Sequence, residues 1–143
     1  MKHLILLIIL TFLISKLFCQ CSIKDYEKFV VQNCFNCNIS QQDSIVRKNI
    51  SLSNSKLTKL RKNFYYKLKN QFNGTDIEKK GLSIKYKKIY ENLKKSRSGI
   101  LLFYRFLGKD GNSESNELMA YWFYTDQMIA ILLDVQENLF GDI

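Results

Sequence analysis

The spacing of apolar residues between Asn54 and Gly74 constrains the fold more than any other feature of this chain. Apolar side chains recur there at intervals of three and four, which places them along one edge of an α-helix and leaves lysines around the rest of its surface. This edge consists of Leu57, Leu60, Phe64, Leu68 and Phe72. Because Asn73 and Gly74 follow, we expect the helix to end there and to dock its apolar edge on the core of the domain.

Shorter patterns predict helices on both sides of this one. Asp25 is a candidate N-cap for a first short helix. Its apolar side is formed by Tyr26, Phe29, Val30 and Cys34. After the central helix, Thr75 and Glu78 have the capping-box pattern for a short turn that Gly81 interrupts, and Ser83 then caps another helix. The buried side of that helix is expected to carry Tyr86, Ile89, Tyr90 and Leu93.

After Gly99 the apolar residues form three nearly continuous runs of aliphatic and aromatic side chains. The runs cover residues 99–108, 116–125 and 127–136, and they are separated by a polar loop and by the corner Thr125-Asp126-Gln127. Short apolar runs bounded by turn residues are typical of buried strands. The pattern therefore predicts a three-stranded antiparallel meander.

The fold class predicted from these patterns is α+β, with two or three N-terminal helices packed on a C-terminal three-stranded antiparallel meander. The segment 44–52 is ambiguous, because its apolar residues alternate only briefly and Lys48 breaks the alternation; we expect it to be extended. No repeat, proline-rich linker or Gly/Ser tract divides the chain, and proline is absent. Residues 22–143 are therefore expected to form a single small domain.

The first 21 residues have the pattern of a secretory signal peptide. Lys2 precedes an apolar run that extends to Ile14, about half the length of a membrane-spanning helix, and Lys16 ends it. Cleavage after Cys19 or after Cys21 fits this pattern, and the second site has the better arrangement of small residues. Acylation at Cys19 and a permanent membrane anchor are weaker alternatives. We expect a secreted or periplasmic protein that is exported through this signal.

The only histidine, His3, lies in the predicted signal, so the mature chain has no imidazole. This excludes Ser-His-Asp and Cys-His nucleophile systems and every zinc site that uses histidine. Cys34 and Cys37 form a C-x-x-C motif at the end of a predicted helix, without the proline that a thioredoxin-like site normally uses. In an exported protein we expect a disulfide, either between these two or from Cys21 to one of them. No catalytic residue, metal site or cofactor is predicted.

Charge is divided unevenly along the chain. Residues 20–98 contain 18 Lys and Arg against six acidic residues, whereas residues 99–143 contain two against seven. A basic region of this kind attracts anionic partners such as phospholipid head groups or acidic glycans; nucleic acid is less expected, and a merely solvated lysine surface is the plainer explanation. The residues expected to contact an anionic surface are Lys59, Arg61, Lys62, Lys67 and Lys69.

These observations favour an exported binding or structural module over an enzyme. Its partner would be a protein, met by the apolar sheet, or an anionic surface, met by the basic helix. The expected sheet interface consists of Tyr121, Trp122, Phe123 and Tyr124. Peripheral membrane contact through the basic amphipathic helix is a further alternative.

A hydrolase that works through paired carboxylates, without histidine, is the alternative function. Its candidate residues are Asp110, Glu114, Glu117 and Asp126. Clustering of these carboxylates in a deep pocket would favour the enzyme, and their exposure to solvent would favour the binding module. Three glycosylation sequons would matter only in a eukaryotic secretory pathway, and they begin at Asn38, Asn49 and Asn73.

Overall fold

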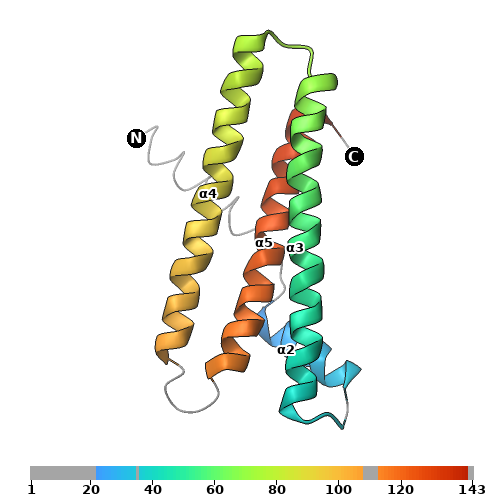
Figure 1. Cartoon of the computed structure of the whole chain (residues 1–143), viewed down its shortest axis with the longest axis vertical. Helices are drawn as coiled ribbons and strands as arrows, with labels where there is room; N and C mark the ends of the chain where they lie inside the picture. Colours follow the sequence, from blue (N-terminus) through green and yellow to red (C-terminus); the bar gives the residue numbers. More distant parts are fainter. Residues whose placement is uncertain (1–21, 35, 108–112, 142–143) are drawn as a thin grey trace, which may run out of the picture.

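The computed structural model describes residues 22–34, 36–107 and 113–141. Nearly all of these residues lie in four helices, which are α2 (Ile23–Asn33), α3 (Ile39–Asn70), α4 (Asp76–Leu107) and α5 (Ser113–Phe140). The long helices α3 and α5 run in one direction and α4 runs in the other, and the short α2 lies at the end where α3 and α5 begin (Figure 1). Because α5 has the most extensive contacts with both α3 and α4, it is the central helix of the bundle.

The predicted C-terminal meander is wrong. No strand occurs among the described residues, and the fold is a helical bundle instead of an α+β domain. The described part of the first run, 99–107, is the end of α4, and the runs 116–125 and 127–136 belong to the single helix α5. The expected corner between them is one turn of that helix.

Burial from several sides explains why α5 resembles strands in sequence. Helices α2, α3 and α4 all contact α5, so apolar residues occupy most of its circumference and the one-sided period of an amphipathic helix is lost. A short apolar run does not by itself separate a buried strand from a buried helix. The stretch from Ser113 to Phe140 contains neither glycine nor proline, so nothing in its 28 residues ends the helix.

Two of the polar residues that suggested a corner, the buried Thr125 and the half-buried Asp126, make hydrogen bonds inside the bundle. The Thr125 hydroxyl donates to the carbonyl of Tyr121 one turn earlier, at 2.7 Å. The Asp126 carboxylate accepts from the Tyr26 hydroxyl of α2 at 2.9 Å and from the Ser53 hydroxyl of α3 at 2.5 Å. Since burying a polar group is costly unless it is hydrogen-bonded, these contacts let α5 continue through the polar stretch while they connect three helices.

The segment 44–52, which we expected to be extended, is helical and lies within α3. A capping box starts this helix well before the clear apolar edge begins: the Asn38 side chain accepts from the Gln41 N–H, and the Gln41 side chain accepts from the Asn38 N–H, both at 3.0 Å. This cap fixes the start of α3 and, with packing against α5, outweighs the brief alternation of apolar residues.

The predicted capping box at the start of α4 is confirmed. The Thr75 N–H donates to the Glu78 carboxylate at 2.7 Å, and this bond lowers the pKa of Glu78. The predicted interruption at Gly81 is wrong, because α4 runs through it without a break. A single interior glycine costs a helix only about 1 kcal/mol, which a helix of this length tolerates.

Leu57, Leu60, Phe64 and Leu68 of the predicted apolar edge are buried, which confirms the orientation of α3, whereas Phe72 lies beyond the end of this helix and is half-buried. Phe64 is fully buried and stacks on Tyr86 of α4, with ring centroids 3.6 Å apart. The cluster around this stack spans α3, α4 and α5, and its buried members are Leu57, Leu60, Phe64, Leu68, Tyr86, Met128 and Leu132. We call it the upper core.

One polar side chain joins the three long helices inside the upper core. Gln136 of α5 is fully buried, and its amide nitrogen donates to the Leu60 carbonyl at 2.9 Å and to the Tyr86 hydroxyl at 3.2 Å. Burial raises the pKa of the Tyr86 phenol, so this group is neutral at physiological pH.

A second cluster attaches α2 to the bundle. Its buried members are Val30, Val46, Met119 and Trp122, which we call the lower core. Tyr26 and Phe29 of α2 meet the Trp122 ring edge-on, with centroids 4.5 and 5.6 Å away. Aromatic pairs in this arrangement add to the stabilisation that burial provides, so the single tryptophan of the chain anchors α2.

Candidate anion-binding surface

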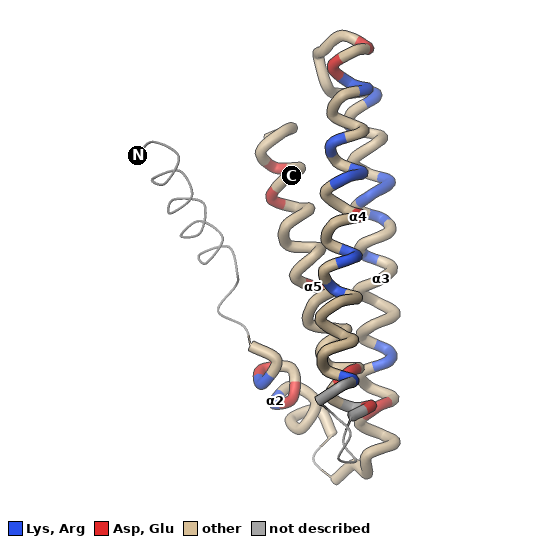
Figure 2. The backbone as a smooth tube through the Cα atoms, turned by 90° about the vertical axis from the view of Figure 1, so that its left-hand side faces the viewer, with Lys and Arg blue, Asp and Glu red and all other residues tan. Residues whose placement is uncertain are grey.

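Positive charge is concentrated on α3 and α4 and is absent from α5 (Figure 2). The residues of α5 that are charged at neutral pH are all acidic, and they are Glu114, Glu117, Asp126, Asp134 and Glu137. Helices α3 and α4, which the turn at 71–75 connects, therefore form a basic hairpin that packs against an acidic helix.

The five basic residues that we predicted on α3 do not share one role. Lys59, Lys62 and Lys69 are exposed. The Arg61 guanidinium is half-buried and lies over the Tyr90 ring, 3.9 Å from its centroid. Lys67 has its ammonium 5.8 Å from the centroid of the Phe140 ring. Arg61 and Lys67 thus contribute cation–π contacts within the bundle.

The residues predicted to contact an anionic surface did not include the lysines of α4. Lys80, Lys87 and Lys94 are exposed and recur every seven residues, which is close to two helical turns and places them in one row. Lys88 and Lys95 form a second exposed row beside it. The seven-residue spacing is the sequence signal that could have identified both rows.

The two salt bridges recorded among the described residues both use arginine. Arg47 of α3 pairs with Glu114 at 2.9 Å, and Arg105 of α4 pairs with Glu117 at 2.5 Å. Hydrogen bonding to Arg105 lowers the pKa of Glu117, so this pair persists at neutral pH. The lysine rows of α4 enter neither pair, so their charge is not neutralised within the described part of the bundle.

An open groove of about 730 Å³ lies where α3 and α4 diverge, toward the end of the bundle that carries α2 (Figure 1). Both salt bridges lie along it. The other lining residues are Ile50, Ser51, Asn54, Leu118 and Tyr121. Each carboxylate in the groove faces an arginine, so the groove combines charged walls with a partly apolar floor.

The carboxylates considered for a hydrolase do not form one cluster. Glu114 and Glu117 line the open groove and are engaged by arginines. Asp126 does not line it and accepts hydrogen bonds from Tyr26 and Ser53. Asp110 lies outside the described residues. An acid and a base that act together need shared access to one substrate, and this arrangement does not provide it for Asp126.

The four aromatic residues predicted as a sheet interface occupy successive positions of α5. Successive residues of a helix are rotated by about 100°, so they point in different directions. Trp122 is buried in the lower core, and Phe123 and Tyr124 are half-buried. Tyr121 lines the groove, and its ring also lies under the Arg97 guanidinium at 4.4 Å. These residues serve several neighbours and do not form a single exposed surface.

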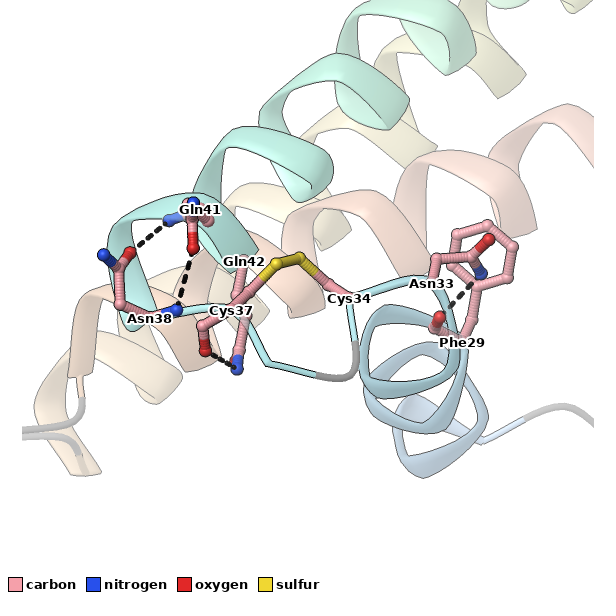
Figure 3. Close-up of a disulfide and its surroundings, with 7 residues drawn as sticks. All are labelled: Phe29, Asn33, Cys34, Cys37, Asn38, Gln41 and Gln42. Carbon is pink, nitrogen blue, oxygen red and sulfur yellow. Dashed lines mark hydrogen bonds between the residues drawn. A yellow bond between two sulfur atoms is a disulfide. The ribbon is translucent and has the colours of Figure 1, made fainter.

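The structure joins Cys34 and Cys37 in a disulfide between α2 and α3 (Figure 3). This geometry is compatible with the predicted pair, and Cys21 lies outside the described residues. The Gln42 side chain donates to the Cys37 carbonyl at 3.2 Å, and Asn33 donates to the Phe29 carbonyl at 2.8 Å, so polar side chains hold the backbone on both sides. The position is that of a staple between two helices.

In the part of the chain that the structure describes, no group of three His, Cys, Asp or Glu side chains could hold a metal ion. None of the helices in the described ranges has the length and apolar character needed to cross a bilayer. The predicted signal peptide, with His3, Cys19 and Cys21, lies outside these ranges.

Comparisons with protein-family models, with curated proteins and with solved structures found no match.

Proposed function

We propose that this chain is an exported binding module that meets an anionic surface through its basic α3–α4 hairpin. The observation that carries this proposal is the exposed row Lys80, Lys87 and Lys94 on α4, with Lys88 and Lys95 beside it. On α3 the exposed Lys62 and Lys69 also lie seven residues apart. Both helices of the hairpin thus carry basic residues at a two-turn repeat.

The alignment of these lysines matters more than their number. Exposed lysine is common on protein surfaces and by itself indicates nothing. Here most of the exposed lysines lie on the hairpin, with Lys24 and Lys28 on α2, while the helix behind the hairpin carries no basic residue. Charges that lie along a rigid helix act together on a flat or extended anionic partner, and their combined field steers it to this side.

The arrangement supports a binding module better than the hydrolase that was the alternative. Glu114 and Glu117 pair with Arg47 and Arg105, so each of these carboxylates has an arginine as its partner. Asp126 connects helices. By contrast, the α4 lysines have no carboxylate partner among the described residues, which leaves them available to an external anion.

Replacing the α4 row tests this proposal. Lys80→Gln/Lys87→Gln/Lys94→Gln is expected to weaken binding to vesicles of phosphatidylcholine and phosphatidylserine about a hundredfold, since each lysine near an anionic surface contributes about 1 kcal/mol. The same variant is expected to elute from immobilised heparin at lower salt than the wild type. Binding is measured by vesicle co-sedimentation and by heparin chromatography.

The matched control removes the same charge outside the α4 row. Lys24→Gln/Lys28→Gln/Lys48→Gln changes three exposed lysines on α2 and at the beginning of α3. It is expected to keep most of the affinity for both probes. If the two triple variants lose affinity equally, only net charge matters and the proposed face is wrong.

A further inference from the structure

We infer that the anionic surface is the surface of a phospholipid bilayer, and that α4 lies flat on it with aliphatic side chains inserted at both of its ends. This inference rests on the proposed function and adds the class of partner. Its basis is a second property of the basic hairpin: exposed aliphatic residues share a face with the lysines.

Five exposed residues of α4 form one row along the helix. Ile77, Ile84, Lys88, Lys95 and Leu102 are separated by intervals of seven, four, seven and seven, which keep them on one line. Ile77 is 84% exposed, Ile84 60% and Leu102 63%. The row therefore has aliphatic residues near both ends of α4 and lysines between them.

Two glycines lie along the same row, and because glycine has no side chain, the helix surface is flatter at these positions. Gly81 lies between Ile77 and Ile84, and Gly99 lies between Lys95 and Leu102. Apart from its chain neighbours and the backbone of its own helix, a Cβ at either position would meet no described atom within 4 Å, so packing does not require a glycine there. Glycine weakens a helix interior, and here no packing within the described chain compensates for it. A flat external surface can approach α4 closely at both positions.

The spacing fits a bilayer surface. At 1.5 Å per residue, Ile77 and Leu102 are about 38 Å apart, so the row is a long, straight contact on the outside of the bundle. Aliphatic side chains at its ends can enter the boundary between head groups and acyl chains. The long stems of Lys88 and Lys95 let their ammonium groups reach the phosphates while the helix lies on the surface.

The side-chain types favour lipid over other anionic partners. Single-stranded nucleic acid is bound by aromatic side chains on which bases stack, whereas the apolar members of this row are isoleucine and leucine. A second copy of the chain docked through the same row would bring two strongly basic helices together, and like charges oppose this. A surface that combines negative charge with an apolar layer matches both kinds of residue.

The test removes the aliphatic residues and keeps every charge. Ile77→Ser/Ile84→Ser is compared with Ile39→Ser/Leu52→Ser, which removes two exposed aliphatic residues of α3. Circular dichroism verifies that both variants fold. Binding to vesicles of phosphatidylcholine and phosphatidylserine, and to phosphatidylcholine alone, is measured at low and high salt, with soluble heparin as a competitor.

The wild type is expected to bind the anionic vesicles, and Ile77→Ser/Ile84→Ser is expected to bind them at least about tenfold more weakly while the control pair binds normally. High salt should weaken the wild type but leave a residual affinity that the Ile77→Ser/Ile84→Ser variant lacks. Equal vesicle binding by both variants would overturn the lipid inference and leave the basic face intact. Binding to heparin without binding to vesicles would also overturn it. Failure to bind either probe would contradict the proposed function as well.

Discussion

Phe64→Ala is expected to lower the free energy of unfolding by about 3–5 kcal/mol, the usual cost of removing a buried aromatic side chain. Phe64 is fully buried, and its ring stacks on Tyr86 and meets Phe140 edge-on at 5.7 Å. The ring thus contacts both neighbouring long helices, so its loss leaves a cavity at the point where α3, α4 and α5 meet. Urea unfolding followed by far-ultraviolet circular dichroism measures the change.

Tyr66→Ala is the control for this substitution. Tyr66 lies two positions along the same helix, and its side chain is 61% exposed. Its removal is expected to change the free energy of unfolding by less than about 0.5 kcal/mol. Phe64→Leu retains an apolar side chain and provides a milder variant in case Phe64→Ala does not fold. If Phe64→Ala and Tyr66→Ala were equally stable, the described orientation of α3 would be wrong.

Trp122→Ala is expected to have an effect of similar size, about 3–5 kcal/mol, at the other end of the bundle. Trp122 is only 8% exposed and is surrounded by residues of α2, α3 and α5. Because α2 is a short helix held by few other contacts, its amides are expected to lose hydrogen-exchange protection more than those of α4. Urea unfolding by circular dichroism and amide hydrogen exchange provide the two measurements.

Phe103→Ala serves as the matched aromatic control, since Phe103 is 59% exposed. It should leave both the unfolding midpoint and the protection of α2 close to those of the wild type. An undiminished protection of α2 in Trp122→Ala would show that the lower core does not anchor this helix.

The apolar residues of α3 that face the core could be predicted from the sequence, because they recur on one side of the helix. Leu57, Leu60, Phe64 and Leu68 are all buried, as their spacing predicts, because α3 packs its edge against the rest of the bundle. The capping box at Thr75 and Glu78 was also predictable from the sequence, since it depends on residues only three positions apart. Local signals of this kind do not require knowledge of tertiary neighbours.

Helix α5 could not be identified from its own sequence pattern in the same way. The apolar pattern of α5 depends on having neighbours on several sides, and a single sequence does not show how many neighbours a segment has. Thr125 and Asp126 had the composition of a turn, but their hydrogen bonds to Tyr121, Tyr26 and Ser53 satisfy them inside the bundle. Two of these partners lie more than 70 residues away in sequence, which explains why the corner was predicted wrongly.

The basic face was only partly predictable. Lysines on α3 were predicted to contact an anionic surface because they surround a clear apolar edge, whereas the seven-residue spacing of the α4 lysines was not recognised. The groove was not predictable, because Arg47, Arg105 and the two glutamates come from three helices. The three helices bring these four side chains together only in the folded bundle, where α3 and α4 diverge beside the beginning of α5.

The measurement that tests the central claim most directly is a map of amide hydrogen exchange with and without anionic vesicles. The account predicts added protection over residues 77–102 of α4 and little change over residues 130–138 on the acidic side of α5. Added protection centred on α5, with α4 unchanged, would contradict the proposed role of the basic hairpin.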